Sequence, residues 1–177
     1  MNHELIIVGA GVAGLSLGKQ VPELNPLVLD RGRGVGGRCA TRRVEGGIPV
    51  DHGVPMIHGR SPELRQLLDA LKEPQPLWDW PMRVRGEGTP CQPQAYDSRT
   101  WRAAFAPGVS AFAKHLAVGQ NIRLDTEVEQ IRLGDGCFEL TVGAETLTAT
   151  RLAVTCPVPQ TAALIAPLAS DAPELAA

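Results

Sequence analysis

The sequence predicts an α/β fold built on a parallel sheet, and two stretches near the N-terminus carry this prediction. An apolar run, Glu4-Leu-Ile-Ile-Val8, leads into the glycine-rich turn Gly9-Ala-Gly-Val-Ala-Gly14, and a second apolar run, Leu27-Val-Leu29, ends at Asp30. Between the two runs, apolar residues recur at the spacing of one helix face until Pro22. A strand, a helix and a second strand in this order form a βαβ unit, in which the two strands are parallel.

The turn after the first strand has the glycine spacing of a dinucleotide-binding site. In such a site Gly9 permits a tight turn, Gly11 lets the backbone approach a pyrophosphate, and Gly14 lets the next helix pack on the strand. A helix that begins near Val12 points its free N–H groups and its positive dipole end at the phosphates. Asp30 is placed to accept hydrogen bonds from ribose hydroxyls. The pattern therefore indicates a Rossmann-like fold, with an unliganded βαβ turn as the alternative.

The charges at the end of the second strand bear on the choice of dinucleotide. The Asp30 carboxylate repels a 2′-phosphate, which argues against NADP in this site. The neighbouring Arg31 weakens that argument, because a guanidinium binds phosphate well. Both residues are therefore candidates for contact with the cofactor.

The segment after Asp30 is too rich in glycine for an ordinary second helix, since it reads Arg31-Gly-Arg-Gly-Val-Gly-Gly-Arg38. Here the sequence resembles the flavin-dependent amine oxidase superfamily and, within it, the renalase-like oxidoreductases, in which a Gly-Gly-Arg motif follows the N-terminal βαβ unit. The resemblance implies that FAD is the cofactor. The alternative for the arginines of this stretch is a solvated basic loop.

The resemblance also implies which residues hold the cofactor. The first glycine cluster and the strand-end acid would bind the ADP half of FAD, and the Gly-Gly-Arg segment would pass along the far side of the pyrophosphate. The family usually has Glu where this chain has Asp30. Val128 would place its backbone against the adenine, or else is a strand residue buried for packing. The expected cofactor-binding residues are Gly9, Gly11, Val12, Ala13, Gly14, Asp30, Arg31, Gly36, Gly37, Arg38 and Val128.

Composition limits the classes of partner and the compartment. The formal net charge of −2 gives no sign of nucleic acid or an anionic membrane as a partner. The cysteines are scattered without a CxxC pair, which favours reduced thiols in a cytoplasmic protein and no metal site. No stretch of the sequence is long and apolar enough to span a bilayer. A small-molecule substrate is therefore expected. The cysteines are Cys39, Cys91, Cys137 and Cys156.

Local signals predict the later elements. Glycines at 46 and 47 predict a hairpin over 44–50, and Ser61 followed by Pro62 predicts the start of a helix over 61–71. A second helix is expected over 110–118. Strands follow over 122–124, 126–133, 137–142 and 146–155 and form a β-meander. Residues 152–155 resemble the family's strand that returns to the parallel sheet.

The expected architecture is a Rossmann-like FAD-binding domain with part of a smaller α+β substrate domain. The FAD-binding βαβ core and a helix occupy 1–72, part of the substrate subdomain occupies 73–110, and 111–177 returns to the first domain. Asp51 and Gly53 resemble a family segment that lies near the flavin. The aromatic residues of the middle region either line an amine or nicotinamide pocket or fill a small core. They are Trp78, Trp80, Tyr96 and Trp101.

The function expected from the resemblance is an FAD-dependent oxidoreductase that transfers hydride from an amine or a reduced nicotinamide, with NAD(P)H as a candidate substrate. The resemblance covers about the first half of a family member, so a missing C-terminal half or a partner subunit is expected. The catalytic residues are unknown, because His52 and His58 have no acidic partner placed by spacing. The alternatives are an NAD-binding Rossmann dehydrogenase, for which Tyr96 lacks a Lys four residues on, and a nucleotide-binding fragment without turnover.

Overall fold

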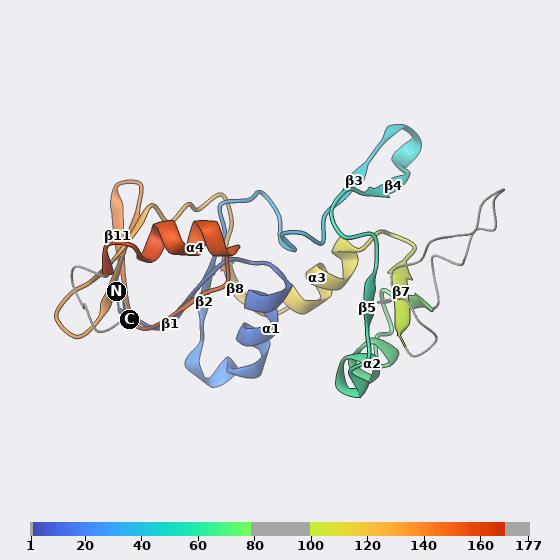
Figure 1. Cartoon of the computed structure of the whole chain (residues 1–177), viewed down its shortest axis with the longest axis horizontal. Helices are drawn as coiled ribbons and strands as arrows, with labels where there is room; N and C mark the ends of the chain where they lie inside the picture. Colours follow the sequence, from blue (N-terminus) through green and yellow to red (C-terminus); the bar gives the residue numbers. More distant parts are fainter. Residues whose placement is uncertain (1, 79–99, 169–177) are drawn as a thin grey trace. The chain divides into compact units, whose positions relative to one another are not determined.

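The computed structural model describes residues 2–78 and 100–168. The chain divides into two compact units (Figure 1): residues 1–37 with 116–177, and residues 38–115. The first unit contains the predicted βαβ unit, and the second runs from Arg38, the last residue of the Gly-Gly-Arg segment, to His115. The expected domain boundaries after residues 72 and 110 stay a prediction.

The first unit is mixed α/β and contains a six-stranded sheet with the order β8-β2-β1-β11-β10-β9. The first four strands in this order run parallel, whereas β10 and β9 join antiparallel. The predicted Rossmann-like fold class, with its mainly parallel sheet, is confirmed. The strands are β1 (Asn2–Val8), β2 (Leu27–Leu29), β8 (Asn121–Arg123), β9 (Gln130–Leu133), β10 (Phe138–Val142) and β11 (Glu145–Val154).

Strand β11 belongs to both halves of this sheet. Its first part pairs antiparallel with β10, from Val142 opposite Glu145 onward. The same strand also pairs in parallel with β1, as far as Val8 opposite Val154. The expected return to the parallel sheet is therefore confirmed, and it is made by the last strand of the meander.

The predicted meander is wrong at its start. Strand β8 pairs in parallel with β2, at the opposite edge of the sheet from β9. Residues 126–129 are not in a strand, because this stretch carries the chain from one edge of the sheet to the other. At its start, this stretch bonds to the loop that follows β2, where the Thr126 N–H donates to the Asp30 carbonyl at 2.9 Å.

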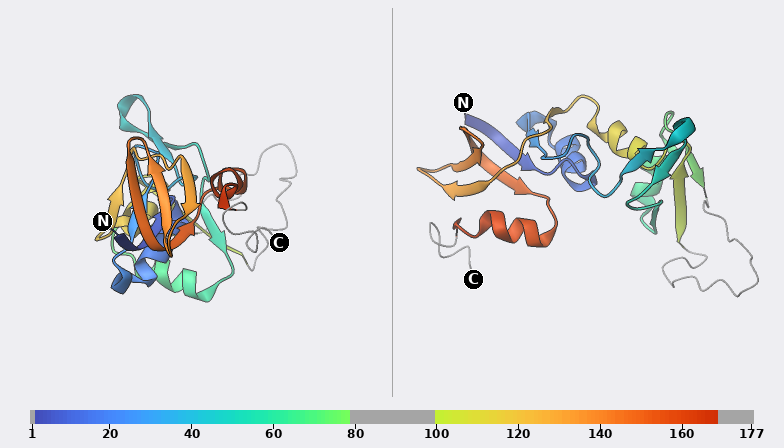
Figure 2. Two further views of the ribbon diagram at one scale, coloured as in Figure 1. Left: turned by 90° about the vertical axis from the view of Figure 1, so that its left-hand side faces the viewer. Right: turned by 90° about the horizontal axis from the view of Figure 1, so that it is seen from above.

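Helices lie on both faces of the sheet (Figures 1 and 2). Successive side chains of a strand point to opposite faces. Ile7 lies near Gly18 of helix α1 (Val12–Gln20), which packs against β1 and β2. Ile6 points to the other face, where helix α4 (Val158–Ile165) contacts β9. Burial on both faces explains why the predicted strands are continuous apolar runs.

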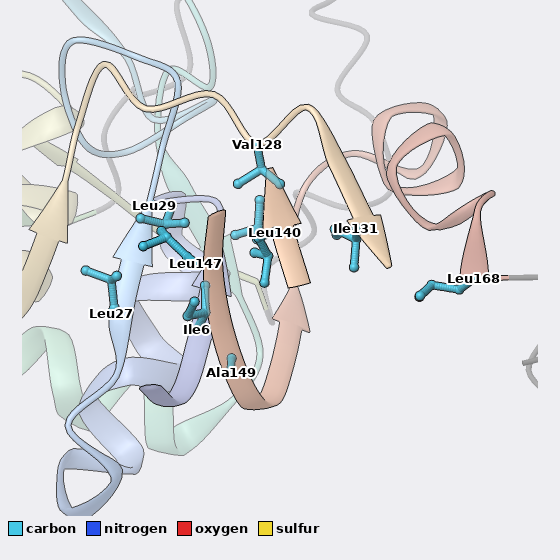
Figure 3. Close-up of a cluster of buried hydrophobic side chains, with 10 residues drawn as sticks. Ile6, Leu27, Leu29, Val128, Ile131, Leu140, Leu147, Ala149 and Leu168 are labelled. Atoms are coloured by element: carbon cyan, nitrogen blue, oxygen red, sulfur yellow. The ribbon is translucent and has the colours of Figure 1, made fainter. Parts of the chain in front are cut away.

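The hydrophobic core on the α4 side is contributed by strands far apart in the sequence (Figure 3). Because β1 and β2 meet β10 and β11 there, long-range pairing and side-chain packing support each other. The cluster consists of Ile6, Val8, Leu27, Leu29, Val128, Ile131, Leu140, Leu147, Ala149 and Leu168.

The second unit is α+β. A hairpin of β3 (Thr41–Arg43) and β4 (Pro49–Asp51) turns at Glu45–Gly47, as the glycine pair predicted. A three-stranded antiparallel sheet has the order β5-β7-β6. Its strands and the nearby helices are β5 (Ile57–Gly59), α2 (Pro62–Asp69), β6 (Pro76–Trp78), β7 (Trp101–Phe105) and α3 (Ser110–Ala117), the last of which continues into the first unit.

The helix signals in this unit are confirmed. The Ser61 hydroxyl accepts a hydrogen bond from the Leu64 N–H at 3.1 Å, which is the N-cap expected from the sequence.

Trp78 and Trp101 form an edge-to-face pair with ring centroids 6.0 Å apart. The guanidinium carbon of Arg65 lies 3.4 Å from the centroid of the Trp78 ring. Trp80, Tyr96 and Cys91 lie outside the described residues.

Candidate functional site

The predicted glycine turn lies at the carboxyl end of β1, where the order of the strands reverses. Strands β2 and β8 lie on one side of β1 and strand β11 lies on the other. In open parallel α/β sheets, ligands bind outside the carboxyl ends of the strands at such a reversal. The site must therefore be built from the loops that follow β1, β2, β8 and β11.

Gly9 makes the sharp turn at the end of β1. Its φ of +111° lies in a region that L side chains rarely adopt. The Gly9 N–H donates to the Leu29 carbonyl at 2.8 Å, so the turn is held by the end of β2. On its other side, the Thr155 hydroxyl donates to the carbonyl oxygens of Val8 and Gly9, at 3.1 and 3.0 Å.

Gly11 and Gly14 have the surroundings that the dinucleotide pattern requires. A Cβ atom built on Gly14 would collide with the Gly9 carbonyl oxygen, so this glycine permits close packing of α1 on the turn. A Cβ atom on Gly11 would meet no heavy atom within 4 Å. The backbone at Gly11 therefore faces open space, in which a pyrophosphate group would have room.

The N-terminus of helix α1 faces the same turn. Gly11 is its N-cap residue, no side chain caps the helix, and the first turn contains no acidic residue. The first N–H groups of a helix have no partner within the helix, and the helix dipole gives them partial positive charge. Val12 and Ala13 in this first turn are only partly buried or exposed. This arrangement is typical of an anion-binding helix terminus.

The second glycine segment lies beside the first. The Gly36 N–H donates to the Ala10 carbonyl at 2.8 Å, and Gly11 and Gly36 form a parallel β-bridge. A Cβ atom on Gly37, whose φ is +54°, would lie 3.4 Å from the Gly11 Cα atom. The structure thus brings Gly36 and Gly37 to the predicted phosphate turn. Arg38, the next residue, is exposed and belongs to the second unit.

Asp30 contacts the backbone of two loops. Its Oδ2 atom accepts a hydrogen bond from the Ala10 N–H at 2.7 Å, and its Oδ1 atom accepts one from the Gly32 N–H at 2.7 Å. Each carboxylate oxygen can accept more than one hydrogen bond, so contacts with ribose hydroxyls remain chemically feasible. Sequence reasoning missed the bond to Gly32. An Asp followed two residues later by Gly is the signal for such an Asx turn.

Arg31 and Cys156 set the local electrostatics. The Arg31 guanidinium lies 3.7 Å from the Glu127 carboxylate, and both side chains are more than half exposed, so the ion pair is weak. The Cys156 thiol lies 3.6 Å from the Val8 carbonyl. Burial raises the pKa of this thiol, the Asp30 charge raises it further and Arg31 partly opposes them. Cys156 is therefore a protonated thiol at neutral pH and a poor nucleophile.

Val128 and Asp51 have structural roles. Val128 lies in the connection between β8 and β9 and is only 6% exposed, with its side chain in the hydrophobic cluster. An adenine contact would have to use its backbone. In the second unit, the Asp51 Oδ1 atom accepts from the Val109 N–H at 3.0 Å and from the Thr41 hydroxyl at 2.6 Å. The Thr41 oxygen in turn accepts from the Ser110 N–H at 3.0 Å, so this pair caps helix α3.

Within residues 2–78 and 100–168, no three His, Cys, Asp or Glu side chains gather as ligands for a metal ion. None of the helices in this part of the chain combines the length and the apolar character needed to cross a membrane. The first unit, with its mainly parallel central sheet, has the Rossmann-like nucleotide-binding fold.

Comparison with known proteins supports this class. Residues 7–71 match the family model of the NAD(P)-binding Rossmann-like domain. No curated protein matches the chain by sequence. Among solved structures, the chain is similar to the CLA-producing fatty acid isomerase from P. acnes, with a TM-score of 0.66 and 15% identity over 92% of this chain and 60% of that one.

Two oxidases have similar structures. A putative protoporphyrinogen oxidase from Exiguobacterium sp. 255-15 matches with a TM-score of 0.60 and 15% identity, over 92% of this chain and 61% of that one. Putrescine oxidase bound to putrescine matches with a TM-score of 0.59 and 13% identity, over 89% and 58%. At these identities the likeness shows the fold. The chain spans about 60% of the length of the structures it matches.

Proposed function

We propose that this chain binds FAD by its ADP half at the carboxyl edge of the first unit, as part of a flavin-dependent oxidoreductase of the amine oxidase type, renalase-like in its motifs. The observation that carries the proposal is the open space at Gly11, beside the uncapped N-terminus of α1 and the Gly36-Gly37 segment. Two close glycine backbones and a positive helix end form a cradle for a pyrophosphate.

The expected residues have distinct roles in this proposal. Gly11, Val12 and Ala13 contribute the backbone and the helix terminus that bind the phosphates. Gly36 and Gly37 line the opposite side, and the guanidinium groups of Arg31 and Arg38 supply positive charge. Gly9 and Gly14 shape the turn, Asp30 acts from the ribose side, and the Val128 backbone borders the adenine. This list is the cofactor site assigned from sequence, and the open cradle supports it.

The proposed reaction is hydride transfer from an amine or a reduced nicotinamide such as NAD(P)H. Bound FAD would supply the redox chemistry, and the protein would bind and orient it. The fold shared with a putrescine oxidase and a protoporphyrinogen oxidase supports an oxidation. Because the chain spans about 60% of those structures, we assign the rest of the substrate site to further chain or to a partner subunit. The compartment we propose is the cytoplasm, from cysteine usage.

A second candidate is binding of NAD at the same edge. The match of residues 7–71 to an NAD(P)-binding Rossmann-like domain favours it specifically. Both candidates use a pyrophosphate cradle, but only FAD binding gives a protein with the visible flavin spectrum. A nucleotide-binding fragment without turnover would bind either ligand and reduce neither.

The test is a titration of the purified chain with FAD and, separately, with NAD, followed by visible absorption and by calorimetry. Stoichiometric flavin uptake supports the proposal, whereas NAD binding without flavin uptake supports the second candidate. Gly11→Val should abolish uptake, because its side chain would occupy the open space of the cradle. Ala144→Val, in the exposed turn between β10 and β11, is the matched control. Equal flavin uptake by both variants would contradict the site assignment.

A further inference from the structure

Every hydrogen-bonding group of Asp30 contacts the protein itself. The Asp30 N–H donates to the Arg123 carbonyl at 3.0 Å, and the Asp30 carbonyl accepts from the Thr126 N–H at 2.9 Å. The carboxylate accepts from the N–H groups of Ala10 and Gly32, each at 2.7 Å. One residue therefore joins three loops that follow three neighbouring strands of the sheet.

These loops all lie at the carboxyl edge of the parallel sheet. They follow β1, β2 and β8, which are neighbours in the order β8-β2-β1. Two further backbone bonds strengthen the connection: Gly9 N–H to Leu29 carbonyl at 2.8 Å, and Asp125 N–H to Gly32 carbonyl at 3.0 Å. Asp30 lies at the centre of this network and is its carboxylate member.

The bond to Ala10 matters most for a nucleotide. Ala10 is the second residue of the phosphate turn and is fully buried, at 0% exposure. A buried N–H that loses its acceptor has no water to replace it. Hydrogen bonds to an ionised carboxylate are also stronger than those to neutral acceptors. Without the Asp30 carboxylate, the turn would therefore favour a different conformation.

We propose that Asp30 is a positioning residue for nucleotide binding: its carboxylate holds the Gly9–Gly11 turn in the shape that receives a pyrophosphate before any ligand binds. Its main contribution to affinity is thus made through the turn and not through the ribose hydroxyls. This inference rests on the proposed function of the same edge, and it gives Asp30 a role that a ribose-binding acid does not have.

The short side chain of Asp30 fits this role. An Asp carboxylate reaches the N–H two residues further along its own chain, which forms an Asx turn. A Cβ atom on Gly32 would lie 2.9 Å from the Asp30 Oδ1 atom, so residue 32 leaves room for that contact. A Glu side chain is one methylene longer and would move the carboxylate away from both N–H groups. In Asp30→Glu, the carboxylate should therefore fail to hold the turn, although a longer acid would suit a ribose contact.

The decisive experiment compares two ligands in two proteins by calorimetry. ADP carries both ribose hydroxyls, and 2′,3′-dideoxy-ADP carries neither. Asn has one acceptor and one NH₂ group, so Asp30→Asn can satisfy only one of the two backbone N–H groups. We expect Asp30→Asn to weaken both ligands by the same factor, about tenfold, the scale of one charge-assisted hydrogen bond. If Asp30→Asn weakens the binding of ADP but not of dideoxy-ADP, the proposal is overturned. The substitution and the removal of the ribose hydroxyls would then be coupled, as expected for a direct contact between them.

A second arm needs no ligand. The amide hydrogen exchange rates of Ala10 and Gly32 are measured by NMR. Each rate is divided by the exchange rate of the Ile7 amide in the same sample, which corrects for a change in global stability. We expect at least tenfold faster relative exchange in Asp30→Asn and no change in Asp135→Asn, a control in an exposed turn. Unchanged exchange at both amides would overturn the proposal. If wild-type protein binds no nucleotide, the proposed function fails, while this arm still tests the role of Asp30 in the turn.

Discussion

The Thr155 hydroxyl, just after β11, lies 3.0 Å from the carbonyl oxygen of Gly9, at the end of β1. It also donates to the Val8 carbonyl at 3.1 Å. A residue 146 positions away in the sequence thus closes the turn on which the proposed phosphate site depends. The return of β11 to the parallel sheet places it there.

The first prediction concerns this contact. Thr155→Val keeps the shape of the side chain but removes the donor, so the free energy of unfolding should fall by about 1 kcal/mol. Flavin uptake should weaken as the turn loosens. Urea unfolding and a flavin titration measure the two effects. Thr155→Ser retains the hydroxyl and should bind flavin like the wild type; wild-type stability and flavin uptake in Thr155→Val would contradict the role of this hydroxyl.

The second prediction separates two glycines of the turn. Gly14→Ala forces a Cβ atom into the Gly9 carbonyl oxygen, so unfolding free energy should fall by about 1–3 kcal/mol, the usual scale for overpacking. Gly11→Ala meets open space and should unfold like the wild type. Urea denaturation of both variants tests this difference. The prediction fails if Gly11→Ala is destabilised as strongly as Gly14→Ala.

The third prediction concerns the cap of helix α3. Asp51→Ala removes the acceptor of the Val109 N–H and the partner of the Thr41 hydroxyl, and should cost about 1–2 kcal/mol of stability. Asp51→Asn keeps one acceptor oxygen and should lose less. Thermal unfolding compares the two variants. If both are as stable as the wild type while flavin uptake falls, Asp51 acts on the cofactor and not on the helix.

The fourth prediction concerns pH and the thiols. Burial raises the pKa of Cys39 above its ordinary 9.0; Asp51 raises it further and Arg38 partly lowers it. As pH rises, the thiol therefore ionises first in the unfolded state. The contribution of the protonated Cys39 thiol to the free energy of unfolding is fully present below about pH 9 and is lost as pH rises through the folded-state pKa. Urea unfolding at pH 8 and pH 10 should show this loss, and Cys39→Ala should reduce it. An equal loss in Cys39→Ala would refute the assignment to this thiol.

Alkylation gives an independent check of the thiols. At pH 8, iodoacetamide should modify Cys39 and Cys156 much more slowly in the folded protein than in urea, because both pKa values are raised by burial. Mass spectrometry of the digested protein measures each site. Fast modification of Cys156 in the folded state would show a reactive thiol beside the proposed phosphate turn.

Apolar spacing and capping residues were sufficient to predict the positions of several strands and helices from the sequence. The run before Gly9, the helix that ends before Pro22, and the helix capped by Ser61 all have the predicted positions. Their apolar spacing and capping residues act within one turn or one strand. The glycine pair at 46 and 47 likewise specified its hairpin, since both residues have positive φ.

The pairing of strands and the partners of the site residues depended on the tertiary structure. Strand β8 could be recognised as a strand, but its partner β2 lies 94 residues earlier, and no local pattern distinguishes parallel pairing there from a meander. Helix α4 was not predicted, although Pro159 in its first turn is compatible with the start of a helix.

The sequence alone was enough to predict the glycine turn with Gly9, Gly11 and Gly14 and the acid Asp30 at the end of the second strand. Such a motif is local, because each glycine is required by the backbone next to it. That the Asp30 carboxylate binds the Ala10 N–H, and that Thr155 closes the turn, was decided only by the tertiary structure. The physical reason is that a hydrogen bond depends on positions in space, and the parallel sheet brings together strand ends that are far apart in the chain.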